Sequence, residues 1–229
     1  MSNQVVLITG AKGALGSIVT QTFLDAGWRV IGTARKIDDA AFPHDGFEGI
    51  PADLTSPPDA AHLVADAISK YGKIDALVHT AGGFAGGAPI HETNDATWES
   101  MLDLNLRAGL NILRAVLPSM RERKSGRIVM IGSRAGVEPA ANISAYAASK
   151  AALVSLVKTA ALENRKLGIT ANVILPGTID TAANRASDPD ADRSKWVSPK
   201  KLAALSLFLV SDDAADITGA AIPVYGAGL

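Results

Sequence analysis

Short runs of β-branched and apolar residues alternate along this chain with longer segments of helical periodicity, and this alternation restricts the fold more than any other feature. The pattern is typical of βαβ units, in which crossover helices connect parallel strands of one sheet. Several strand-like runs are apolar almost throughout, as strands covered on both faces must be. We therefore predict an α/β Rossmann fold with a doubly wound, seven-stranded parallel sheet and helices on both faces.

These periodicities place the individual elements. The predicted strands are Val5–Thr9, Arg29–Thr33, Gly49–Ala52, Ala76–Thr80, Arg127–Ile131, Thr170–Leu175 and Ala221–Val224. The predicted helices are Ala14–Ala26, Pro58–Lys70, Asp95–Arg121, Ser144–Leu167 and Pro199–Val210. No compositional seam divides the 229 residues, so we expect one domain, 1–229. Ligands of such sheets bind beyond the carboxyl ends of the strands, so the residues that follow the strands carry the functional information.

Charge and composition exclude several classes of function. The 22 basic and 23 acidic side chains are spread along the chain, so no basic stripe predicts a nucleic-acid partner. The chain has no cysteine, which removes thiolate ligands and nucleophiles, and we predict no metal site. Residues 1–8 have no basic flank and too short an apolar run for export or membrane spanning, so we expect a cytoplasmic protein without membrane contact.

A glycine-rich turn follows the first predicted strand and leads directly into a helical pattern. Glycine lets the backbone approach a pyrophosphate, which then sits on the free N–H groups and the positive dipole end of the helix. The order of strand, glycine turn and helix predicts a dinucleotide site, and an ordinary β–α turn is the alternative. The predicted contact residues of this loop are Gly10, Lys12, Gly13, Ala14, Leu15 and Gly16.

The end of the second predicted strand indicates which dinucleotide is bound. An enzyme selective for NAD usually has an acidic residue there for the ribose 2′-hydroxyl, whereas this chain has Ala34 and Arg35. Arg35 and Lys12 would hold a 2′-phosphate through charge-assisted hydrogen bonds, which favours NADP(H). NAD(H) is the alternative if both cations are only solvated surface residues and Asp38 or Asp39 reaches the ribose.

Tyr146 and Lys150 are four residues apart in a predicted helix, so their side chains project from one face. A phenol has a pKa near ~10 in water, and a neighbouring ammonium favours the phenolate, which suits acid–base catalysis. Ser133 ends the fifth predicted strand, where its hydroxyl would hold a substrate oxygen beside the tyrosine. Asn105 is an amide in an apolar helical stretch, and it is either a core amide with satisfied bonds or the ligand of a water connected to Lys150.

Taken in their order along the chain, these motifs resemble the short-chain dehydrogenase/reductase family over essentially the whole sequence. The resemblance implies a catalytic tetrad in which Tyr146 is the general acid/base and Lys150 binds the nicotinamide ribose and lowers the pKa of the tyrosine. Ser133 would orient the carbonyl, and Asn105 would support a proton relay through water. The resemblance also implies cofactor contacts at Ala34, Arg35, Asp53, Leu54, Ala81, Gly82, Gly83, Pro176, Gly177, Ile179 and Thr181, besides Tyr146 and Lys150.

Two features depart from the family's usual pattern. The glycines follow the G-x-x-G-x-x-G spacing of the extended members instead of the G-x-x-x-G-x-G spacing of the compact ones. The fourth predicted strand continues as His79-Thr80-Ala81-Gly82 where the family usually has Asn-Asn-Ala-Gly. The place of His79 within the strand favours a packed histidine over a proton donor.

A narrower likeness concerns the runs 13–17 and 81–87 and the lid from 175 through 196, which are similar to dihydropteridine reductase, a member of the same family. We expect residues 177–197 to form a substrate lid without regular periodicity. Phe84 and Trp196 would line the substrate pocket or cover the core beneath the lid. Dihydropteridine reductase favours NADH and lacks the tetrad's asparagine and serine, so the likeness indicates a shared scaffold and lid.

These observations predict an NADPH-dependent oxidoreductase that transfers a hydride between nicotinamide and a small carbonyl or alcohol substrate, which makes it a ketone or aldehyde reductase. A pterin reductase is one alternative. A non-catalytic NADP(H)-sensing protein is another, although such sensors tend to lose the tyrosine or the lysine. The resemblance implies a homotetramer or a homodimer that pairs through the helices predicted at 95–121 and 144–167.

Overall fold

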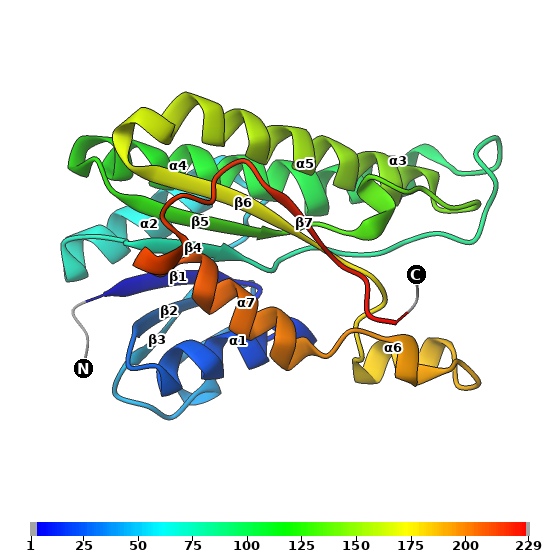
Figure 1. Cartoon of the computed structure of the whole chain (residues 1–229), viewed down its shortest axis with the longest axis horizontal. Coiled ribbons are helices and arrows are strands. Elements are labelled where there is room, and N and C mark those ends of the chain that lie inside the picture. Colours follow the sequence, from blue (N-terminus) through cyan, green and yellow to red (C-terminus); the bar gives the residue numbers. More distant parts are fainter. Residues whose placement is uncertain (1–3, 228–229) are drawn as a thin grey trace.

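The computed structural model describes residues 4–227, and the ends of the predicted domain, 1–3 and 228–229, lie outside the described residues. Seven parallel strands form one sheet, as predicted, and their order is β3-β2-β1-β4-β5-β6-β7 (Figure 1). The strand order reverses between β1 and β4, which is the point where such sheets bind ligands. The strands are β1 (Val5–Thr9), β2 (Arg29–Ala34), β3 (Phe47–Pro51), β4 (Ala76–His79), β5 (Gly126–Ile131), β6 (Ile169–Pro176) and β7 (Ala221–Val224).

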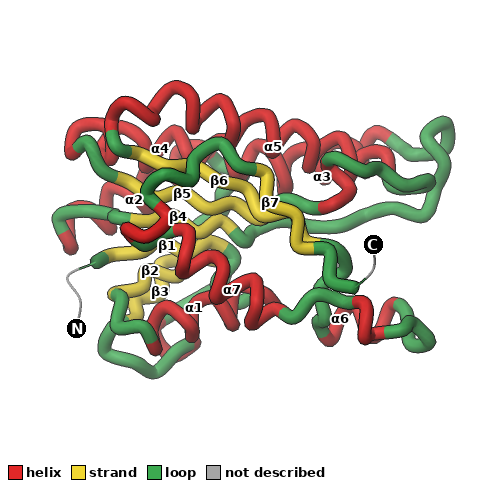
Figure 2. The backbone as a smooth tube through the Cα atoms, in the orientation of Figure 1, coloured by secondary structure: helices red, strands yellow, loops and turns green. Residues whose placement is uncertain are grey.

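Helices cover both faces of the sheet and bury two apolar cores (Figure 2). Successive side chains of β1 point to opposite faces: Leu7 lies in one core and Val6 and Ile8 lie in the other. This two-sided burial explains why the strands are apolar throughout. One face carries α2 (Pro57–Tyr71), α4 (Ala108–Arg123) and α5 (Ser144–Asn164), and the other carries α1 (Ala14–Asp25) and α7 (Pro199–Leu209).

The segment predicted as one helix over Asp95–Arg121 is interrupted, and that prediction was wrong in this respect. It comprises α3 (Asp95–Leu102), a π-helical turn at Asp103–Arg107, and α4. In the π turn the N–H of Ala108 donates to the carbonyl of Asp103, one residue further back than in an α-helix. The extra residue changes which side chains face the core, and Asn105 is fully buried as a result.

The predicted lid 177–197 is more regular than expected. It contains a short helix, α6 (Ala182–Ser187), which begins where the Thr181 hydroxyl accepts a hydrogen bond from the N–H of Asn184 at 3.2 Å. Its two ends are held together by a bridge between Ile179 and Val197. The expectation of an irregular loop was therefore wrong, because six residues of helix are too few to establish a period.

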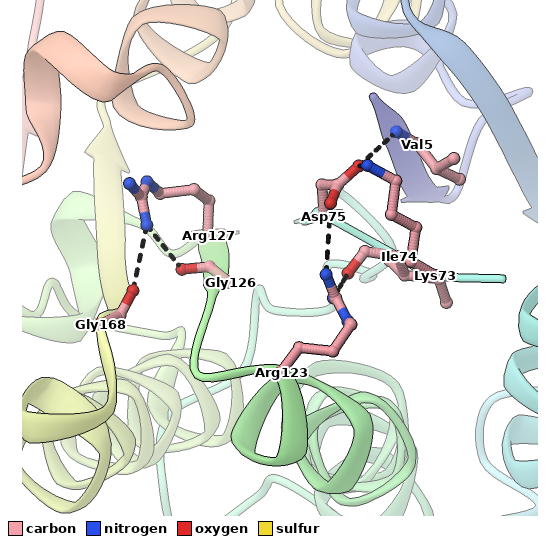
Figure 3. A network of polar contacts seen from close by, with 8 residues as sticks. All are labelled: Val5, Lys73, Ile74, Asp75, Arg123, Gly126, Arg127 and Gly168. Carbon is pink, nitrogen blue, oxygen red and sulfur yellow. Dashed lines mark hydrogen bonds and ion pairs between the residues drawn. The ribbon is translucent and has the colours of Figure 1, made fainter. Parts of the chain in front are cut away.

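A polar network fixes the amino ends of the strands, opposite the ligand-binding edge (Figure 3). The carboxylate of Asp75 accepts a hydrogen bond from the N–H of Val5 at 2.9 Å. The same carboxylate forms ion pairs with Lys73 at 3.0 Å and Arg123 at 3.3 Å. Arg127 nearby donates to the carbonyl of Gly168 at 3.1 Å and so connects β5 to the start of β6. These contacts hold β1, β4, β5 and β6 in register at the end far from the site.

Two features are absent from residues 4–227. No helix in this range is long and apolar enough to cross a membrane. No group of three or more histidine, aspartate or glutamate side chains in it could hold a metal ion.

Candidate active site

A cavity of about 590 Å³ opens at the carboxyl ends of β1, β2, β3 and β4. Four separate strand ends contribute to it, so only the parallel sheet brings these residues together. The cavity also lies at the switch point between β1 and β4, where a dinucleotide is expected on such a sheet. Its lining includes the predicted cofactor residues Gly10, Ala34, Arg35, Asp53, Leu54, Ala81 and Gly82.

The loop at 10–16 needs glycine because its backbone packs closely on itself and on the segment that follows β4. Gly10 has a φ of +67°, and a Cβ there would lie 2.9 Å from the backbone nitrogen of Ala81. A Cβ on Gly16 would lie only 2.0 Å from the carbonyl oxygen of Gly10. Gly13 is the N-cap residue of α1, and its N–H donates to the Gly10 carbonyl at 2.8 Å. The spacing of these three glycines is therefore a requirement of the turn's own packing against β4.

Other predicted cofactor residues do not line this cavity. Lys12 is exposed on the glycine loop, whereas Gly16 is buried in the first turn of α1. Gly177 packs against the backbone of Tyr225, and Thr181 caps α6. The other predicted cofactor residues that do not line the cavity are Gly13, Ala14, Leu15, Gly83, Pro176 and Ile179.

The charged side chains at the end of β2 differ in their position. Arg35 lines the cavity, whereas Asp38 and Asp39 do not. The carboxylate of Asp39 instead accepts a hydrogen bond from the N–H of Gly49 at 2.8 Å. Across the cavity entrance, Asp53 accepts hydrogen bonds from the hydroxyl and the N–H of Thr55, which lower the pKa of Asp53, and the charge of Arg35 lowers it further. Arg35 is thus the cation available to a ligand of this cavity.

One wall of the cavity was missed by the sequence reasoning. It is formed by Glu99 and Ser100 of α3 and by Asp103 and Leu104 of the π turn. No local motif marks these residues, since only the packing of α3 beside the strand ends brings them to the cavity.

Ser133, which follows β5, comes together with Tyr146 and Lys150 of the first two turns of α5. Ser133 and Tyr146 form a side-chain hydrogen bond. Burial raises the pKa of Tyr146, and this hydrogen bond offsets part of the rise. The net shift is thus upward, and the lowering of the Tyr146 pKa by Lys150, which the family resemblance implies, stays a prediction. The Lys150 ammonium donates to the carbonyl of Ile131 at 3.1 Å, and burial lowers the pKa of Lys150 to about 8.

The side chain of Asn105 forms its hydrogen bonds with protein groups. Its carbonyl oxygen accepts from the N–H of Gly83 at 2.9 Å, and its nitrogen donates to the carbonyl of Gly83 at 3.1 Å. The same nitrogen also donates to the hydroxyl of Ser149 at 3.1 Å. These contacts agree with the sequence-based explanation of a core amide with satisfied bonds, and the water connected to Lys150 stays a prediction.

His79 is a packed histidine, as its place in the strand indicated. The side chain is fully buried, and its Nδ1 lies 2.8 Å from the hydroxyl of Thr9. Burial and the nearby charge of Lys150 lower the pKa of His79 to about 3. Its Nε2 has no hydrogen-bond partner and lies 3.5 Å from the position that a Cβ on Gly109 would occupy. A neutral, enclosed imidazole of this kind is unsuited to proton donation near neutral pH.

The two aromatic residues assigned to the substrate pocket occupy different environments. Phe84 is 67% exposed, so it does not cover the core. Its ring meets the ring of Tyr146 edge-on, with centroids 5.0 Å apart. Trp196 is partly buried and immediately precedes the buried Val197 at the end of the lid segment. Phe84 is therefore the aromatic residue that adjoins the tyrosine.

The fold and the site define a Rossmann-type α/β protein with a serine, a tyrosine and a lysine beside a cavity of dinucleotide type. The family model for short chain dehydrogenases matches residues 4–192. Over 97% of its length the chain is 32% identical to the short chain dehydrogenase adrF of Penicillium rubens, covering 96% of that protein. Over the same shares of both chains it is 30% identical to the 3-oxoacyl-(acyl-carrier-protein) reductase FabG of Salmonella typhimurium.

A solved structure of ElxO with NADP bound has the same fold, with a TM-score of 0.92, 24% identity and 98% of each chain covered. The chain belongs to the short-chain dehydrogenase/reductase family of oxidoreductases.

Proposed function

We propose that this protein is an NADPH-dependent carbonyl reductase that acts on a ketone or an aldehyde. The observation that carries the proposal is the hydrogen-bonded Ser133–Tyr146 pair beside the buried Lys150. The similarity to a 3-oxoacyl reductase supports a ketone, because its name specifies a ketone group. The exposed ring of Phe84 beside Tyr146 supports an apolar substrate body.

The residues around the cavity fit an adenine dinucleotide. The glycine loop presents free N–H groups at the start of α1, which suits a pyrophosphate. Arg35 stands at the cavity where a 2′-phosphate needs a cation, and none of its neighbours up to Asp39 adds a carboxylate there. The NADP-bound structural relative supports the same choice of cofactor. When bound, the nicotinamide supplies the hydride.

The protein's own groups would then bind and protonate the substrate oxygen. Ser133 holds the carbonyl oxygen next to the hydroxyl of Tyr146, and Tyr146 donates its proton to that oxygen as the alcohol forms. The Lys150 ammonium would exchange the Ile131 carbonyl for the ribose hydroxyls and hold the sugar near the tyrosine. Asn105 keeps the Gly83 backbone in place at the rim of the site.

Replacement of the proton donor tests the reaction. Tyr146→Phe should reduce turnover of carbonyl substrates with NADPH by about 100-fold or more, the usual share of a general acid. Tyr71→Phe is the matched control, because Tyr71 at the end of α2 bonds Glu48 of the edge strand β3 and does not line the cavity. Full activity of Tyr146→Phe would refute the proposed function.

Cofactor titration tests the phosphate pocket. Nicotinamide fluorescence should show tighter binding of NADPH than of NADH by the unmodified protein. Arg35→Ala should weaken NADPH binding by about tenfold and leave NADH unchanged, because a hydrogen bond to a charged group contributes about 1.5–3 kcal/mol. Lys36→Ala is the control, since this exposed neighbour does not line the cavity. Preferred NADH binding would instead favour the pterin reductase alternative.

We also propose that the protein is a homotetramer or a homodimer. The family resemblance implies pairing through the region of α5, and Leu162 of that helix, which is 65% exposed, is the apolar side chain there at which pairing can be tested. Sedimentation of the unmodified protein should give a dimer or a tetramer, and Leu162→Lys should shift it toward the monomer. A monomer at micromolar concentration would refute this assignment.

A further inference from the structure

Ser149 lies between two elements of the proposed active site without facing its cavity. It precedes Lys150 in α5, and its side chain is fully buried. The hydroxyl donates to the backbone carbonyl of Tyr146 at 2.8 Å. The same oxygen accepts a hydrogen bond from the side chain of Asn105 at 3.1 Å. One small hydroxyl thus connects the turn of α5 that carries the tyrosine to the π turn of the neighbouring helix.

The connection extends from Asn105 to the segment that follows β4. Asn105 binds both the N–H and the carbonyl of Gly83. The preceding residue, Gly82, lines the cavity, and a Cβ there would lie 2.8 Å from the Asn105 oxygen and 3.3 Å from the Lys150 ammonium. Gly82 in the cavity wall, the Asn105 amide and the Lys150 ammonium are therefore packed against one another. The Ser149 hydroxyl connects this cluster to the backbone carbonyl of Tyr146.

We infer that Ser149 is a positioning residue, which sets the place of Tyr146 relative to the cavity by holding Asn105 and the Tyr146 backbone together. The inference rests on the proposed reductase function. Its physical basis is the rigidity of a fully satisfied buried network, in which every member limits the movement of the others. Removing the hydroxyl would leave the Asn105 nitrogen with the Gly83 carbonyl and the weak acceptor Met101 Sδ at 3.7 Å, and would free the first turn of α5 to shift.

Ser206 provides a matched control within the same chain. It is also fully buried in a helix, α7, and its hydroxyl also donates to a helix carbonyl, that of Leu202 at 2.8 Å. It belongs to α7, which packs on the face of the sheet opposite α5. Ser149→Ala and Ser206→Ala therefore remove the same chemical group from comparable surroundings, and a purely structural role would give them similar effects.

The experiment compares the two variants by steady-state kinetics and by cofactor titration. We expect Ser149→Ala to lower kcat by about tenfold with little change in the KM of the carbonyl, because small displacements of a reacting group can cost up to ~100-fold in rate. It should also weaken NADPH binding, since Gly82 lines the cavity. Ser206→Ala should change neither. Equal kinetics and equal affinities for the two variants would overturn the inference.

Coupling to Asn105 gives a second test. The loss of kcat in the double variant Asn105→Ala/Ser149→Ala should be much smaller than the product of the two single losses, because both act through one hydrogen bond. Independent, multiplying losses would argue against the inference. If Ser149→Ala does not fold, Ser149→Cys and Ser206→Cys allow the same comparison with a weaker hydrogen-bonding group.

The outcome for Ser149 can be separated from that for the proposed function. If the unmodified protein reduces no carbonyl at all, the proposed function fails, and the NADPH affinities alone decide the inference. Weaker binding by Ser149→Ala than by Ser206→Ala would then still support the role of Ser149, and identical binding would refute it.

Discussion

The buried state of His79 predicts how the stability of the protein depends on pH. Its pKa in the folded protein is about 3, against about 6.5 for a free histidine. Between these values the unfolded chain binds a proton that the folded chain does not, so the free energy of unfolding falls as the pH falls below 6.5. From pH 6.5 to 4.5 this one group should remove about 2 kcal/mol, at a limiting slope of about 1.36 kcal/mol per pH unit.

Urea unfolding at several pH values measures this effect, with His79→Asn as the perturbation. Asparagine retains a polar group for the Thr9 hydroxyl but does not titrate. The stability difference between the unmodified protein and His79→Asn should therefore shrink or reverse by about 2 kcal/mol between pH 6.5 and 4.5, whatever its value at neutral pH. His91→Asn, at a side chain that is 75% exposed, should follow the unmodified protein. A constant difference between the unmodified protein and His79→Asn across this range would refute the reasoning.

Three further predictions concern the loop, the lysine and the far end of the sheet. Gly16→Ala should weaken cofactor binding and lower the melting temperature, because its Cβ would lie 2.0 Å from the Gly10 carbonyl oxygen; titration and thermal unfolding check both effects. The kcat/KM for carbonyl reduction should fall as the pH rises through about 8, where Lys150 of the unliganded protein loses its proton. The Lys150→Arg variant should be slower, and its pH profile should lack this decrease, because arginine keeps its charge. Asp75→Asn should lower the free energy of unfolding in urea by about 2 kcal/mol while NADPH affinity is unchanged, because the Arg123 ion pair lies away from the cavity.

The strands could be predicted from the sequence because their signal is local. The apolar run of β1 is bounded on both sides by polar or glycine residues, and its predicted and observed bounds are the same, Val5–Thr9. The π turn at Asp103–Arg107 could not be predicted in this way. Its extra residue is stabilised by the contacts of Asn105 with Gly83 and Ser149, which are distant in sequence. A period of 3.6 residues cannot reveal such an interruption.

The site likewise contains residues that the sequence predicts and residues that it does not. Gly10, Arg35, Asp53 and Ala81 each follow a strand, and parallel strands end at one edge, so their convergence on one cavity was predictable. The opposite wall around Glu99 depends on how α3 packs, which no strand-end argument addresses. Sequence spacing also placed Tyr146 and Lys150 on one helix face. It did not give the direction of their pKa shifts, because burial determines these shifts.

Burial moves the pKa values of the two central groups in opposite directions. It raises the pKa of Tyr146, so the phenol keeps its proton at neutral pH. It lowers the pKa of Lys150 only to about 8, so most of the lysine remains an ammonium at pH 7. A protonated phenol can donate to a carbonyl oxygen at once, whereas oxidation of an alcohol first requires the phenolate as a base. Before any ligand binds, Tyr146 therefore holds the proton that the proposed carbonyl reduction would transfer.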